Sequence, residues 1–92
     1  MVSANLKDWK EVTKGIYRYV ISANAAYEIH IKYWDMETDI LSANASLYIV
    51  EKWHYKDGTS AVVARECLLN SVPVMVCIGK AIEDVKKYNT TF

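Results

Sequence analysis

Apolar side chains recur at every second position over much of the region between residues 17 and 50, which is the period of a β-strand with one buried face. We predict three strands there, over residues 17–21, 27–33 and 41–50. A helix over residues 40–52 is the competing interpretation of the third segment. The turn signal Lys56-Asp57-Gly58 then precedes a fourth strand over residues 61–66, because Asp and Gly tolerate the left-handed conformations of tight hairpin turns.

Both ends of the chain show helical spacing instead. Asn5 followed by Asp8 resembles a helix start, and Gly15 would end this short N-terminal helix. Pro73 suits the first turn of a second helix, which we expect to run to about Tyr88. Its predicted buried stripe is Val74, Ile78, Ala81, Ile82 and Val85, and its charged face carries Lys80, Glu83, Asp84, Lys86 and Lys87.

These elements predict an α+β fold. It is a four-stranded antiparallel β-meander with the C-terminal α-helix packed on one face and the short N-terminal helix beside it. A chain of 92 residues with 52% hydrophobic residues can build one core and not two, so we expect residues 1–92 to form a single domain. The last few residues are expected to be disordered.

The requirement for one apolar face predicts the strand register, because a slip of one residue exchanges the two faces of a strand. Tyr19 is then expected opposite Ile29, and Ile31 opposite Ala43. The core side receives Tyr17, Tyr19, Tyr27 and Tyr33, while the outer face receives Arg18, Val20, Glu28, His30, Lys32, Trp34, Ser42, Asn44, Ser46, Tyr48 and Val50. On that face Arg18, His30 and Asn44 would form one row across three strands.

A short repeat also occurs, since Ile21-Ser22-Ala23-Asn24-Ala25 returns as Leu41-Ser42-Ala43-Asn44-Ala45. Duplication of a strand unit and chance are both open explanations. Neither explanation assigns a function.

Charge and composition limit the partners. The 11 basic and 11 acidic residues cancel, so no long-range field draws the chain to phosphates or anionic lipid, and a nucleic-acid partner is disfavoured. The apolar runs are far shorter than the ~20 residues of a membrane helix, and no signal peptide is recognised. The chain is therefore predicted to be cytoplasmic, without a membrane partner, and Cys67 and Cys77 to be buried, reduced thiols.

Candidate chemistries are few. The chain has two His and two Cys, which is the number of ligands in a closed zinc site. Their spacing in the sequence does not match that of metal ligands. The predicted register also places His30 and His54 on the order of 30 Å apart, at ~3.3 Å per residue. We predict no metal and no cofactor. A small hydrolase that uses Cys67 or His54 stays an alternative, although neither residue has a recognisable activator.

Protein binding needs no catalytic group and can use aromatic and Arg anchors on a rigid face. The sequence therefore predicts a non-catalytic domain that binds another protein through Arg18, His30, Trp34, Asn44 and Tyr48. Such a domain would suit an inhibitor or adaptor encoded by a phage or mobile element, of the anti-CRISPR type, although no motif carries that resemblance.

A single-stranded RNA-binding sheet is the alternative among binding modules, although the sequence shows no basic groove. The oligomeric state is open, and a dimer through an unpaired edge strand is compatible with the predicted sheet.

Overall fold

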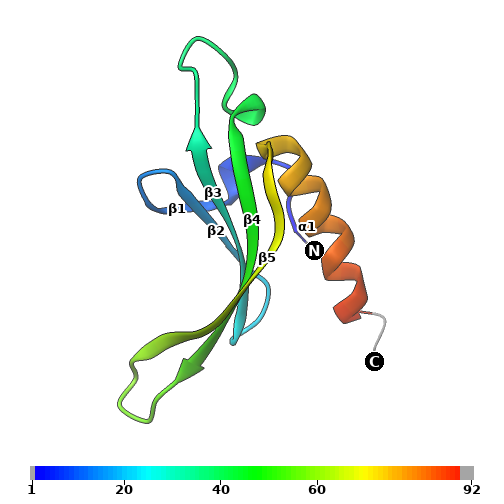
Figure 1. The fold of residues 1–92 in the computed structure, drawn as a ribbon. Helices are drawn as coiled ribbons and strands as arrows, with labels where there is room; N and C mark the ends of the chain where they lie inside the picture. Colours follow the sequence, from blue (N-terminus) through cyan, green and yellow to red (C-terminus); the bar gives the residue numbers. More distant parts are fainter. Residues whose placement is uncertain (1, 90–92) are drawn as a thin grey trace.

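One antiparallel sheet and one C-terminal helix make up the computed structural model, which describes residues 2–89 (Figure 1). The elements are the strands β1 (Lys10–Thr13), β2 (Ile16–Val20), β3 (Ala25–Tyr33), β4 (Asn44–His54) and β5 (Ser60–Pro73), the helix α1 (Val74–Asn89), and the 3-10 turns η1 (Leu6–Asp8) and η2 (Ile40–Ser42). Each strand pairs with its neighbours in sequence, in the order β1-β2-β3-β4-β5. The predicted α+β class is confirmed, but the sheet has five strands and not four.

The fifth strand arises where the N-terminal helix was expected, so that prediction was wrong. Within residues 2–15 only the short turn η1 is helical. The side chain of its N-cap Asn5 accepts a hydrogen bond from the backbone N–H of Lys7. After it, β1 pairs with β2 through a turn in which Gly15 has φ of 82°. The β-branched residues Val12 and Thr13 favour this extended backbone, and pairing with β2 satisfies its hydrogen-bonding groups.

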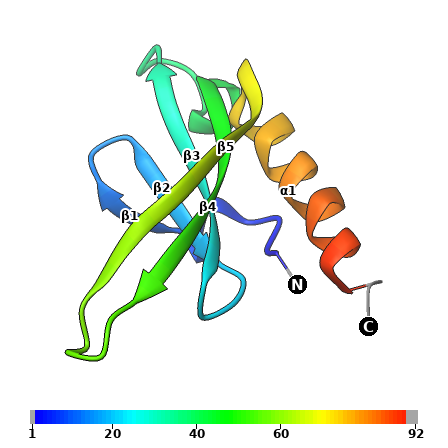
Figure 2. The same cartoon turned by 60° about the horizontal axis from the view of Figure 1, so that its bottom comes forward.

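The helix α1 covers one face of the sheet, over β3, β4 and β5 (Figure 2). The predicted stripe is confirmed, since Val74, Ile78, Ala81 and Val85 are buried and Ile82 is half-buried against the same core. The strand β5 ends at Pro73, and the helix starts one residue later.

One residue of the expected charged face of α1 turns inward. Asp84 is only 7% exposed and accepts a hydrogen bond of 2.6 Å from the hydroxyl of Tyr27 on β3. Its other oxygen lies 3.8 Å from the ammonium of Lys87. The bond to Tyr27 joins helix and sheet through a buried polar contact that the helical pattern did not predict.

The N-terminal segment lies on the same side of the sheet as α1 (Figure 1). Val2 and Trp9 are buried in the core cluster, and the indole N–H of Trp9 donates a 3.1 Å hydrogen bond to the carbonyl of Ser3. The Trp9 ring lies 5.4 Å from that of Tyr19 on β2. The segment and α1 lie on one side of the sheet, and Figures 1 and 2 show no helix of residues 2–89 on the opposite side, which we call the outer face.

The strand register differs by two residues from the predicted one at both central pairings. Tyr19 lies opposite Tyr27 and not Ile29, and Ile31 lies opposite Ala45 and not Ala43. Two local features cause these shifts. After the turn of residues 21–24, β3 pairs with β2 from Ala26 onward. Residues 40–42, expected in the third strand, form η2 instead, so β4 starts later. An even shift keeps every side chain on its face, but it changes which residues are neighbours.

Irregular pairing at the end of β3 overturns two face assignments. The register shifts between Ile31 and Tyr33, and the Tyr33 side chain turns out to solvent with 71% exposure. Trp34, expected on the outer face, is half-buried against the core cluster and donates its indole N–H to the carbonyl of Thr38 at 3.1 Å. A β-bulge reorients the side chains that follow it, which strict alternation cannot predict.

The strand interpretation of the segment around residues 41–50 is confirmed, apart from its first residues in η2. The expected disorder of the last few residues concerns positions 90–92, which lie outside the described part of the chain. No helix within residues 2–89 is both long and apolar enough to cross a membrane.

Candidate functional site: the outer face of the sheet

The outer face carries one continuous row of residues across all five strands. Residues directly opposed in an antiparallel ladder project to the same side of the sheet. The ladders place Lys10, Arg18, Glu28, Tyr48 and Cys67 opposite one another in turn, from β1 to β5. This row crosses the centre of the face that α1 leaves uncovered.

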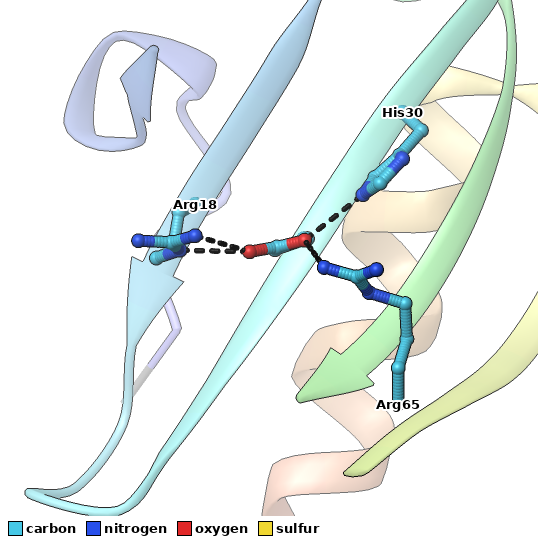
Figure 3. Close-up of polar contacts among 4 residues, drawn as sticks. Arg18, His30 and Arg65 are labelled. Atoms are coloured by element: carbon cyan, nitrogen blue, oxygen red, sulfur yellow. Dashed lines mark hydrogen bonds and ion pairs between the residues drawn. The ribbon is translucent and has the colours of Figure 1, made fainter. Parts of the chain in front are cut away.

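Glu28 is the centre of this face, and its side chain is only 1% exposed. One carboxylate oxygen accepts from Nε and Nη2 of Arg18 at 2.8 and 2.6 Å. The other oxygen lies 2.9 Å from Nε2 of His30 and 3.4 Å from Nη2 of Arg65. Figure 3 shows the three partners surrounding the carboxylate, from β2, β3 and β5. We call these four residues the Glu28 cluster.

The Glu28 cluster keeps its carboxylate ionised. Burial opposes the charge, but the hydrogen bonds from His30 and Arg18 and the charges of Arg18 and Arg65 outweigh burial, so the pKa of Glu28 lies below its ordinary value. An ionised carboxylate only accepts hydrogen bonds, and Nε2 of His30 is therefore the donor in their contact. A buried charge needs such partners, since an unpaired one would be strongly destabilising.

Charge is unevenly distributed over the molecule, although its total is zero. The outer-face positions of the sheet carry the cations Lys10, Arg18, Lys32 and Arg65, and Glu28 is the one acid on this face within the described strands. Glu11, Glu51 and Glu66 oppose core-side residues in the ladders and so lie on the other side of the sheet. The neutral total therefore conceals a locally basic face, which the charge count alone could not reveal.

Hydrogen bonds to Asn70 hold Lys32 in place on the outer face. Ser46 is fully buried, and its hydroxyl donates to the side-chain oxygen of Asn70 at 2.7 Å. The ammonium of Lys32 contacts the same oxygen, which ties the end of β3 to β5 across β4. Lys32 is thus held on the outer face next to the Glu28 cluster.

Of the five predicted binding residues, the structure brings three together. Arg18 and His30 both contact Glu28, and the rings of His30 and Tyr48 lie 4.6 Å apart. The predicted row was wrong, because Arg18 faces Glu28, His30 faces Ser46, and Asn44 lies beyond them, opposite Tyr33. Trp34 belongs to the core side, as described above.

Sequence reasoning missed Glu28 and Arg65 as members of the site. A Glu at an outward strand position is typical of a solvated side chain, so nothing in the pattern indicated that Glu28 would be buried. Arg65 comes from a distant strand, 37 residues along the chain, and its position depends on the irregular register of β5. Only the tertiary pairing of β4 with β5 places it here.

The residues considered for catalysis are dispersed. Cys67 is exposed, contrary to expectation, and its thiol donates to the carbonyl of Leu69 at 3.3 Å. Cys77 is buried as predicted, and burial together with the proximity of Cys67 raises the pKa of its thiol to about 11. His54 lies at the far end of β4, in contact with the carbonyl of Ala23. Within the described residues, no three His, Cys, Asp or Glu side chains gather as metal ligands would.

Comparison with known proteins shows no relative: no family model matches the chain, and no curated protein and no solved structure matches it significantly.

Proposed function

We propose that the protein is a non-catalytic binding module that docks the outer face of its sheet onto an acidic surface of another protein. The observation that carries this proposal is the charge of that face, where Lys10, Arg18, Lys32 and Arg65 share the described strands with a single acid that is itself buried. An acidic partner surface would meet cations across the face without a solvent-exposed carboxylate among them.

The face also carries the residue types that anchor protein interfaces. Arg and Tyr are enriched among the residues that contribute most to binding, and Arg18 and Tyr48 lie in one row at its centre. Val20, on the same face, is 62% exposed and adds apolar surface beside Arg18. The lysines at the edges would contribute mainly to the rate of association. Inhibitor and adaptor roles both act through binding alone, and both fit this proposal.

Capture of partners from cell extract with the tagged protein tests the proposal, followed by measurement of the dissociation constant for the protein recovered. We expect Tyr48→Ala to weaken that complex by about tenfold or more, as truncation of a central aromatic anchor does. The double variant Lys10→Glu with Lys32→Glu should slow association and reduce its dependence on salt.

Two matched controls separate the outer face from the remainder of the surface. Lys86→Glu changes the charge of an exposed helix residue on the other side of the molecule, and Trp34→Phe alters an aromatic residue of the core side. Both should leave the affinity unchanged. Full affinity of folded Tyr48→Ala and of the double lysine variant would contradict the proposal.

Capture of RNA in place of protein would favour the alternative binding module. In that case the amount of RNA retained by the protein should fall steeply as the salt concentration rises, because phosphate binding releases counterions. That result would replace the proposed partner while leaving the outer face as the site.

A further inference from the structure

The Glu28 cluster has the chemistry of an oxyanion site, and we infer that Arg18 and Arg65 bind a phosphate monoester on the partner, such as a phosphorylated side chain. This inference rests on the proposed function and names the group that the outer face recognises.

Arg18 presents an unoccupied edge of its guanidinium. Its Nε and Nη2 both donate to one oxygen of Glu28, so the edge formed by Nε and Nη2 faces the carboxylate. A guanidinium has five N–H donors, so three remain: both N–H groups of Nη1 and the second N–H of Nη2. None of these three donors has a hydrogen-bond partner among residues 2–89, and a fork edge of this kind matches two oxygens of a phosphoryl group.

Arg65 supplies the second fork from the other side of the carboxylate (Figure 3). It contacts Glu28 through Nη2 only, at 3.4 Å, and its side chain is 45% exposed. This single contact occupies one N–H of Nη2, so one bidentate edge of the guanidinium stays without a hydrogen-bond partner among residues 2–89. The two guanidiniums come from β2 and β5, and the buried carboxylate between them fixes their positions.

Glu28 acts here as the positioning residue. Two neighbouring guanidiniums repel each other, and the carboxylate offsets this repulsion, so that both cations can be held ready before a ligand arrives. Because Glu28 is 1% exposed, an approaching anion meets the cations and not the carboxylate. Preorganised donors lose less conformational entropy on binding than free surface arginines do.

Charge favours a phosphate monoester over the alternatives. The cations Lys10, Arg18, Lys32 and Arg65 exceed the charge of Glu28 by three, which suits a group that carries about −1.5 to −2 at neutral pH. A carboxylate carries a charge of only −1 and has two oxygens, so it would use one fork only. A nucleic-acid backbone calls for cations that follow its path, whereas Arg18 and Arg65 converge on one carboxylate.

Nuclear magnetic resonance titration of the purified protein with small probes tests this inference. The probes are O-phosphoserine, acetate and a short oligothymidine, each added at constant ionic strength while the side-chain Nε–H signals of Arg18 and Arg65 are followed. We expect saturable shifts of both signals with O-phosphoserine, at a dissociation constant on the order of millimolar, since only a few charge-assisted hydrogen bonds form.

Arg65→Gln is the main variant, because Arg65 is the more exposed of the two arginines and its replacement spares the pair of Arg18 with Glu28. It should weaken O-phosphoserine binding by about fivefold or more, and Arg65→Lys should restore only part of the affinity, since an ammonium lacks the planar fork. Lys86→Gln is the control, and it should bind as the unchanged protein does.

Equal shifts with acetate, tighter binding of oligothymidine than of O-phosphoserine, or unchanged affinity in folded Arg65→Gln would each overturn the inference. Its failure is distinguishable from failure of the proposed function. If the probes do not bind but the Tyr48→Ala and lysine variants still lose the captured protein, the outer face binds a partner without a phosphoryl anchor. If the probes bind but no protein is captured through this face, the oxyanion site stands and the proposed function fails.

Discussion

Replacement of the buried carboxylate by an amide, Glu28→Gln, tests the central electrostatic feature of the fold. The substitution keeps the shape of the side chain but removes the charge that holds Arg18, His30 and Arg65. Breaking a fully buried ion pair costs about 3–5 kcal/mol, because the remaining charge stays without a partner. Here the arginines are 24% and 45% exposed and can turn toward water, so we expect a smaller loss of about 1–3 kcal/mol in the free energy of unfolding.

The effect should depend on pH in a defined direction. The pKa of Glu28 is lowered in the folded protein, so its contribution is fully present above the ordinary carboxyl pKa of ~4.3 and is lost as the pH falls through the lowered folded value. Urea unfolding followed by Trp fluorescence, at pH 7 and again at pH 3, measures the difference between the two proteins. We expect this difference to be smaller at pH 3 than at pH 7.

Glu66→Gln is the matched control, since Glu66 is an exposed acid on β5 that projects to the other side of the sheet. Its effect should stay within about 0.5 kcal/mol. The reasoning is refuted if Glu28→Gln costs less than the control, or if its cost is the same at both pH values. A double-mutant cycle with Arg18→Met then measures how much of the loss belongs to that one pair.

Three further predictions compare buried residues with exposed ones. Tyr27→Phe removes the buried hydrogen bond to α1 and should lower the free energy of unfolding by about 1–3 kcal/mol, measured in urea. Ile78→Ala should cost about 2–5 kcal/mol in the same assay, whereas Lys86→Ala on the exposed side of α1 should be nearly silent. Iodoacetamide at pH 8 should label Cys67 in the folded protein and leave Cys77 unmodified until urea is added, as mass spectrometry can show.

The period of the apolar residues determined the elements and faces of the central strands. A strand alternates its side chains with a period of two, so Tyr27 and Ile29 had to share the buried face wherever the strand began. The stripe of α1 followed from the helical period in the same way. These properties are local, so the faces were predicted correctly although the predicted register was wrong by two residues at both central pairings.

The partners across the sheet were decided by tertiary structure. Whether Arg18 meets Glu28 or His30 depends on where the turns close, and the free-energy differences between even registers come from many contacts along both strands. The β-bulges in β3 and β5 turned Tyr33 outward and brought Arg65 toward Glu28, and a bulge leaves no mark in the alternation pattern.

The candidate site shows the same division. The sequence by itself determined that Arg18, His30 and Tyr48 lie on one outward face, because each occupies an alternate position of a strand. Only the tertiary structure decided that an acid is buried among them and that cations collect around it, since burial and local charge depend on distant strands coming together. The net charge of a sequence does not depend on where the charged residues lie in space. The basic face exists because the fold places most acidic residues of the strands on the other side of the sheet.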